Sequence, residues 1–173
     1  MAELAGETVA SPLLRYWSGS PYWLGPASGP AITSGHAVKY SLVPRFDGVA
    51  PPDEPDNSPD DYLSQALARY LRTQAAVFEF RVQLQTDPVA MPVEDTSVEW
   101  DEEVSKPIPV ATLTIGVQDV DSPAGRAFAE ACESMAFSPW NALAEHRPLG
   151  GINRLRQAVY LASQAKRAAN GVA

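Results

Sequence analysis

Residues 76–87 read AVFEFRVQLQTD. Apolar side chains occupy every second position of this stretch, and charged or amide side chains occupy most of the positions between them (Phe78, Phe80, Val82 and Leu84 against Val77, Glu79, Arg81, Gln83 and Gln85). Successive side chains of a strand point to opposite faces, so the pattern predicts a β-strand with one buried face. Strands of this kind are typical of antiparallel sheets, whereas parallel βαβ sheets contain strands that are apolar on both faces.

The stretches around this strand predict a mixture of strands and helices. We expect further strands at 36–44 and 108–120, and a short one at 96–100, because they are rich in strand-forming residues. Helices are predicted at 58–74, 122–137 and 150–170, and the first two open with Ser-Pro, a sequence typical of a helix start. The second carries an apolar stripe of Phe128, Cys132 and Met135, which is expected to be buried. The chain is therefore expected to be α+β, an antiparallel β-sheet with packed helices. About three or four strands are too few to close a barrel alone.

The length of 173 residues suits a single domain, 1–173, with one core. Residues 1–11 are expected to be disordered. Residues 44–58 are rich in proline and aspartate and are expected to form a long loop within the domain.

Composition excludes several classes of function. The net charge of −8 disfavours nucleic-acid binding, and the single cysteine excludes an internal disulfide. No apolar run approaches the ~20 residues of a membrane helix, and the N-terminus lacks the pattern of a signal peptide. We therefore expect a soluble, cytoplasmic protein without a membrane partner.

The last predicted helix carries the strongest candidate for chemistry. Arg156 and Tyr160 lie one turn apart and so share a helix face. Leu155, Val159 and Ala162 form a neighbouring apolar stripe that is expected to face the core. On this pattern alone Tyr160 is more simply a packing residue. The alternative is a phenol that the guanidinium holds as phenolate, which would be a hard anionic ligand for ferric iron.

Four stretches, in order, resemble the haem catalase family. They are DTSVEW (95–100), IPVATLTI (108–115), MAFSPWN (135–141) and the Arg-x-x-x-Tyr of 156–160. They are similar to the second half of the catalase domain, and the surrounding sequence looks closest to the catalase-related peroxidase branch. The resemblance covers roughly Pro12 to Arg167 and implies a partial catalase-like β-barrel.

The resemblance also implies a site and an activity. Tyr160 matches the proximal iron ligand of haem b, and Arg156 matches the arginine that keeps this tyrosine ionised; both are therefore candidate catalytic residues. Phe137 and Ile152 match apolar residues that touch the macrocycle. The implied activity is decomposition of hydrogen peroxide or an organic hydroperoxide.

The distal histidine and asparagine of the family have no match in this sequence. His36 leads into the strand at 36–44 and is interpreted as structural, while His146 either lies near a haem edge or caps the loop. The chain thus resembles only the C-terminal half of the domain, and whether it is an enzyme stays open. Two alternatives also stay open: a truncated, non-catalytic interaction or structural module, and a hydroperoxide isomerase of the allene oxide synthase type. An incomplete barrel leaves strand edges unpaired, so we expect self-association or a partner chain that supplies the distal half.

Overall fold

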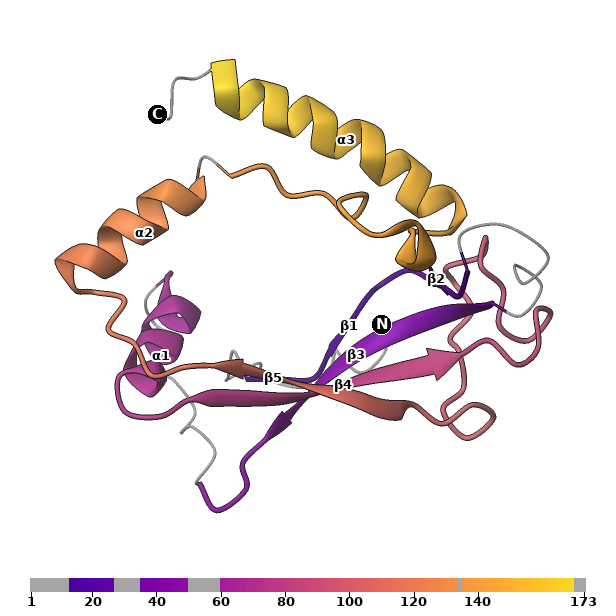
Figure 1. Cartoon of the computed structure of the whole chain (residues 1–173), viewed down its shortest axis with the longest axis horizontal. Coiled ribbons are helices and arrows are strands. Elements are labelled where there is room, and N and C mark those ends of the chain that lie inside the picture. Colours follow the sequence, from indigo (N-terminus) through magenta and orange to yellow (C-terminus); the bar gives the residue numbers. More distant parts are fainter. Residues whose placement is uncertain (1–12, 27–34, 50–59, 134, 170–173) are drawn as a thin grey trace. The chain divides into compact units, whose positions relative to one another are not determined.

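The computed structural model describes residues 13–26, 35–49, 60–133 and 135–169. The expected disordered segment 1–11 lies outside the described residues, as does most of the expected loop at 44–58. The elements in chain order are labelled in Figure 1: β1 (Tyr16–Trp17), β2 (Tyr22–Leu24), β3 (His36–Arg45), α1 (Tyr62–Leu71), β4 (Ala76–Leu84), β5 (Ile108–Ile115), α2 (Pro123–Glu133), a short 3-10 helix η3 (Ala144–His146) and α3 (Gly150–Ala169).

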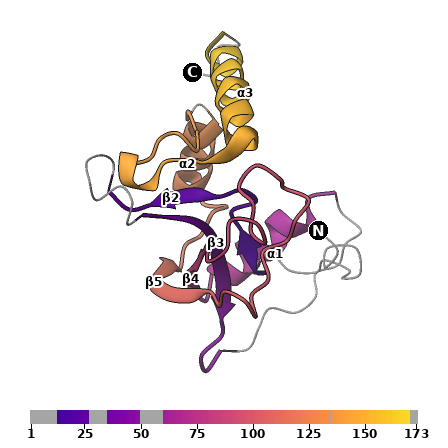
Figure 2. The ribbon, with the colours of Figure 1, turned by 90° about the vertical axis from the view of Figure 1, so that its right-hand side faces the viewer.

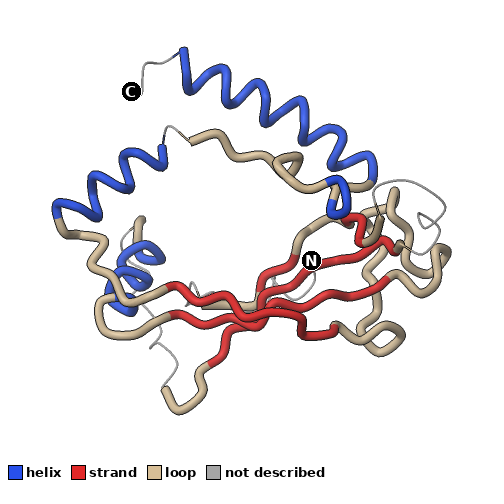
Figure 3. The backbone as a smooth tube through the Cα atoms, viewed as in Figure 1, coloured by secondary structure: helices blue, strands red, loops and turns tan. Residues whose placement is uncertain are grey.

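The described strands form one five-stranded sheet (Figure 3). The order is β1-β3-β4-β5, and β2 pairs antiparallel with β3 at the end where Tyr22 lies opposite Val38. The described residues also form three α-helices, so the predicted α+β class is confirmed.

Most predicted elements are present, and several of them are shorter than predicted. The strand predicted at 108–120 ends at Ile115, and the helix predicted at 122–137 ends at Glu133. The prediction of a strand at 96–100 is wrong. The Asp95 carboxylate accepts hydrogen bonds from the Ser97 backbone N–H (2.9 Å) and hydroxyl (2.6 Å), which turns the chain there instead.

Backbone contacts divide the chain into two compact units. One comprises residues 1–16, 42–80 and 111–129, and the other comprises 17–41, 81–110 and 130–173. We call them unit 1 and unit 2 and describe each by itself. The assignment of the whole chain to a single domain stays a prediction.

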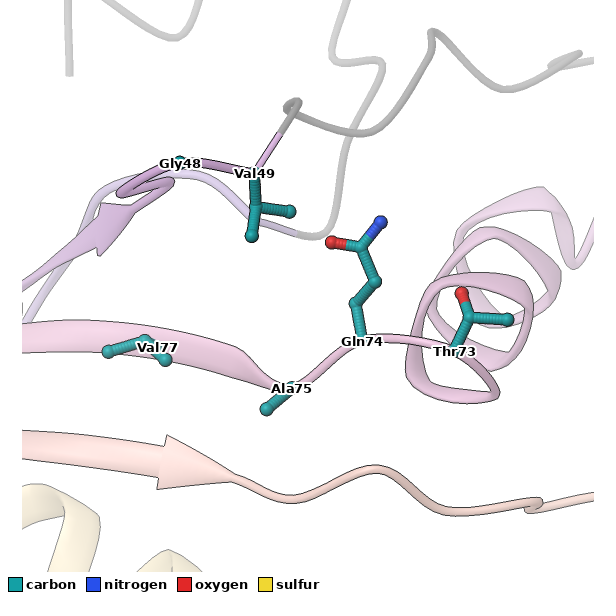
Figure 4. A pocket seen from close by; sticks show the side chains of 6 residues that line it. All are labelled: Gly48, Val49, Thr73, Gln74, Ala75 and Val77. Carbon is teal, nitrogen blue, oxygen red and sulfur yellow. The ribbon is translucent and has the colours of Figure 1, made fainter.

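Unit 1 has an ordinary apolar core. Leu13, Leu71, Ala76 and Phe78 are buried, and Leu67 and Tyr70 of α1 pack on them. A shallow surface hollow in this unit lies between the turn after β3 and the start of β4 (Figure 4). Its lining is Gly48, Val49, Thr73, Gln74, Ala75 and Val77. No charged side chain lines it, so it offers little to a reactive ligand.

Unit 2 has a smaller core around an indole. Trp100 is 2% exposed, packs with Ala37 and Met91, and donates its indole N–H to the Pro92 carbonyl at 3.2 Å. The buried Gln83 amide of β4 donates to the Trp100 carbonyl at 3.0 Å. Leu149, the residue before α3, packs against this cluster, so the core positions the start of that helix.

The helix α2 departs from its prediction. None of its described residues is buried, and Phe128, which was expected on a core-facing stripe, is 66% exposed. Met135 of the same predicted stripe lies beyond the helix and is 42% exposed, and Cys132 is partly exposed. The expectation that this stripe is buried is wrong.

Candidate functional site: the polar face of α3

The start of α3 is fixed by glycine and by a carboxylate. Gly150 has φ +83°, and a Cβ there would lie 2.8 Å from the Val93 carbonyl oxygen, so a larger residue would be strained. Glu94 accepts a hydrogen bond from the Gly151 N–H at 2.8 Å and pairs with both terminal nitrogens of Arg154 at 3.1 Å. The Arg154 hydrogen bond, followed by that from Gly151, lowers the pKa of the Glu94 carboxyl. A carboxylate at a helix N-terminus also offsets the positive end of the helix dipole.

The same end of α3 is tied to the hairpin region that holds β2. Figures 1 and 2 show β2 beside the start of the helix. The Trp23 N–H donates to the Arg147 carbonyl at 2.8 Å, and the Leu149 N–H donates to the Pro21 carbonyl at 3.0 Å. Arg147 also lies over the Trp23 ring, 4.8 Å from its centroid.

The two faces of α3 are the reverse of the predicted ones. Beyond the two glycines at its start, the residues that are buried or partly buried along the helix are polar: Asn153 (0% exposed), Arg156, Tyr160 and Gln164. The apolar residues that were expected to face the core are exposed, Leu155 to 62% and Val159 to 56%, and Ala162 is exposed as well. The prediction of a core-facing Leu155, Val159 and Ala162 stripe is therefore wrong. The helix turns its polar side to its own chain.

The structure places Arg156 and Tyr160 in contact. The Arg156 Nη2 donates to the Tyr160 hydroxyl at 3.3 Å, and the guanidinium carbon lies 5.5 Å from the centroid of the ring. This hydrogen bond is the largest cause of a raised pKa for the Arg156 guanidinium. The arginine therefore stays cationic beside the phenol.

Two more tyrosines lie near this pair. Tyr22 of β2 interacts with Arg156 and helps to raise its pKa. The Tyr22 ring lies 5.2 Å from that of Tyr40, and burial, together with Tyr22, raises the pKa of the Tyr40 phenol. Sequence reasoning did not find Tyr22, because no local pattern links a strand residue to an arginine so far along the chain.

Phe137 lies on a segment that runs along α3. The Gln164 side-chain amide donates to the Phe137 carbonyl at 3.1 Å, one turn beyond Tyr160. Arg167 donates to the Glu133 carbonyl at 3.2 Å, and the Trp140 indole N–H donates to the Asn153 carbonyl at 3.0 Å. The Phe137 side chain is 56% exposed, and Ile152, near the beginning of α3, is 42% exposed. Both apolar side chains are thus substantially exposed.

The histidines and the described acidic residues form no metal-binding cluster. His36 is exposed at the beginning of β3, where it pairs with Leu24 of β2, and His146 is exposed in η3. Within the described ranges, no group of three or more His, Cys, Asp or Glu side chains could hold a metal ion. A tyrosine ligand to a haem iron would not belong to such a group. No helix in the described part is long and apolar enough to span a bilayer.

The fold is similar to part of the catalase fold. A fungal catalase crystal structure matches with a TM-score of 0.69 and 16% identity, over 91% of this chain and 32% of the catalase chain. A bacterial catalase structure matches with a TM-score of 0.67 and 17% identity, over 91% of this chain and 31% of that chain. The chain thus spans about a third of the length of these catalases. No protein-family model matches it, and no curated protein sequence does. At such identities the likeness shows a partial catalase-like fold.

Proposed function

We propose that this chain is a haem-binding, catalase-related protein, with decomposition of hydrogen peroxide or an organic hydroperoxide as its ancestral activity. The observation that carries the proposal is the 3.3 Å hydrogen bond from the Arg156 guanidinium to the Tyr160 hydroxyl. It occurs in a chain whose fold matches catalases over 91% of its length.

The donor set suits haem b. Tyr160 would ligate the iron through its phenol oxygen, and Arg156, which donates a hydrogen bond to that oxygen, would orient it. Phe137 and Ile152 would supply apolar surface to the macrocycle, since both are substantially exposed in the described structure. Haem held by a tyrosinate supplies the two-electron peroxide chemistry of this ligand class.

Turnover needs groups that deprotonate and orient the peroxide, and we propose that a partner polypeptide supplies this distal half. The support is the outward apolar side of α3, where Leu155 and Val159 lie one turn apart and are 62% and 56% exposed. Exposed apolar residues that gather on one face mark interaction surfaces. When the chain is purified alone, we expect the same residues to drive self-association.

A non-catalytic interaction module is the second candidate function. It is favoured by the bonds that the polar residues of α3 make within their own chain, such as Gln164 to the Phe137 carbonyl. In this alternative the Arg156–Tyr160 contact is a packing remnant, and neither stoichiometric haem uptake nor peroxide turnover occurs.

A titration with haemin tests the proposal. The unaltered chain should take up one equivalent and give a ferric-tyrosinate absorption spectrum. Tyr160→Phe should abolish that spectrum, because phenylalanine keeps the ring but removes the ligand oxygen. Tyr62→Phe on α1, in unit 1, is the matched control and should leave the spectrum unchanged. An identical haemin spectrum in the chain and in Tyr160→Phe would refute the assignment of the ligand.

A further inference from the structure

Asn153 is the most deeply buried polar residue of α3. Its relative exposure is 0%, although it lies in the first turn of a helix whose apolar side chains are largely exposed. A buried amide is costly unless its donors and acceptor are paired. The hydrogen-bond partners of Asn153 therefore indicate why an amide side chain is buried at this position.

The partners of Asn153 fix the orientation of its amide. The Nδ2 group donates to the Pro21 carbonyl at 2.9 Å and to the Leu149 carbonyl at 2.8 Å. Both are acceptors only, so the amide nitrogen must face them. The Oδ1 atom is then turned to the other side, where the Ser20 hydroxyl donates to it at 3.0 Å. The rotated amide would bring its oxygen against two carbonyl oxygens.

The oxygen side of this amide holds Arg156. The Arg156 Nη1 donates to Asn153 Oδ1 at 3.2 Å and to the Ser20 hydroxyl oxygen at 3.3 Å. Ser20 is itself 3% exposed, and its hydroxyl proton is already given to Asn153, so its oxygen is left to accept. The two polar residues form one acceptor pair for a single guanidinium nitrogen.

A guanidinium is a planar fork, so fixing one terminal nitrogen restricts the other. With Nη1 held by Ser20 and Asn153, Nη2 is directed along the helix to the Tyr160 hydroxyl. A free arginine on a helix surface would instead sample many rotamers, and ordering it would cost side-chain entropy. The network supplies that order before any ligand arrives.

We propose that Ser20 and Asn153 are positioning residues that hold the Arg156 guanidinium against the Tyr160 phenol. Both accept a hydrogen bond from Arg156, and they act on Tyr160 through that guanidinium. That the fixed Arg156 side chain serves a haem site rests on the proposed function. That Ser20 and Asn153 fix the Arg156 side chain does not, and it can be measured without haem.

The first readout is the arginine side chain in the chain without haemin. Nitrogen-15 NMR separates guanidinium groups whose rotation is hindered by hydrogen bonds from those that rotate freely, and Arg156→Lys assigns the signal of Arg156. The unaltered chain should show hindered rotation for Arg156. Asn153→Ala and Ser20→Ala should each lose it, whereas Ser20→Thr, which keeps the hydroxyl, should retain it.

The control is Gln157→Ala, at an exposed position of α3 next to Arg156, which should leave the Arg156 signal unchanged. Asn153→Ala removes four hydrogen bonds of a buried group and could unfold the helix start, so circular dichroism accompanies each variant. Ser20→Ala is the gentler substitution, and it decides the outcome if Asn153→Ala fails to fold.

The second readout is the spectrum with haemin. If the haem site exists, Ser20→Ala should lose part of the ferric-tyrosinate spectrum and Ser20→Thr should restore it. Hindered Arg156 rotation that depends on Ser20, without haemin uptake by the unaltered chain, would support the positioning role and refute the proposed function. Arg156 rotation that is free in the unaltered chain, or still hindered in folded Ser20→Ala, would overturn the positioning role whatever haemin does.

Discussion

The helices α1 and α3 are built in opposite ways. In α1 the buried residues are apolar, Ala66, Ala68 and Leu71, and charged or amide side chains such as Gln65 and Arg69 are exposed. In α3 the fully buried side chain is Asn153, while Leu155 and Val159 are largely exposed. Apolar burial stabilises a helix in its domain, so α1 is explained by folding alone. The arrangement of α3 is not, and it agrees with the proposal that its polar side holds the Arg156–Tyr160 pair and that its apolar side binds a partner.

The largest expected effect is on the free energy of unfolding, which an alanine substitution should lower far more in α1 than in α3. Leu71→Ala should cost about 2–5 kcal/mol of unfolding free energy, because Leu71 is 3% exposed and packs on Ala76 and Phe78. Leu155→Ala should change the free energy by less than about 0.5 kcal/mol, since Leu155 is 62% exposed. Urea unfolding of the two variants measures the difference. Equal losses would mean that the apolar face of α3 is part of the core after all.

A second, intermediate effect concerns association. The double substitution Leu155→Lys and Val159→Lys should reduce the average mass in solution toward that of one 18.6 kDa chain, because charged side chains oppose burial of the face. Light scattering and sedimentation velocity measure this mass. Leu63→Lys, at a leucine of α1 that is 38% exposed, is the control and should leave the mass unchanged. A monodisperse monomer before any substitution would contradict the assignment of this face to a partner.

The smallest expected effect is on the pH dependence of protein stability, through Glu94 at the start of α3. Since the folded state lowers the pKa of Glu94 from its usual 4.5, the carboxylate contributes stability above that value and loses it as the pH falls through the lowered pKa. Glu94→Gln should therefore be less stable than the unaltered chain at neutral pH, and the difference should shrink in acid. Glu99→Gln, which removes a neighbouring charge, is the control. Denaturant midpoints between neutral and acidic pH provide the test, and a difference that grows in acid would contradict it.

The sequence predicted the fold class because the deciding patterns are local. The alternation in 76–87 and the helical periodicity in 58–74 lie within single elements, and the corresponding β4 and α1 are present. The strands β1 and β2 have two and three residues, too few to show a period, and they were not predicted. The prediction of a strand at 96–100 was wrong. Its strand-forming residues follow Asp95, whose carboxylate accepts a hydrogen bond from the Ser97 backbone and so turns the chain.

Within the candidate site, the four-residue spacing of Arg156 and Tyr160 was sufficient to predict their contact. The inward direction of that face was not predicted, because periodicity assigns the apolar stripe to the core by default. Ser20 and Asn153 were missed since their contact joins distant parts of the chain, and neither residue type signals chemistry alone. Only the folded arrangement brings the acceptor pair to the guanidinium.

The central claim is that α3 presents Tyr160, held by Arg156, as an iron ligand. Resonance Raman spectroscopy of the haemin-loaded chain tests it most directly, because vibrations of an iron-bound phenolate are enhanced by excitation of its charge-transfer band. We predict phenolate bands that shift when the chain carries ring-deuterated tyrosine and that vanish in Tyr160→Phe. Haemin that binds without any isotope-sensitive phenolate band, or bands that persist in Tyr160→Phe, would contradict the account.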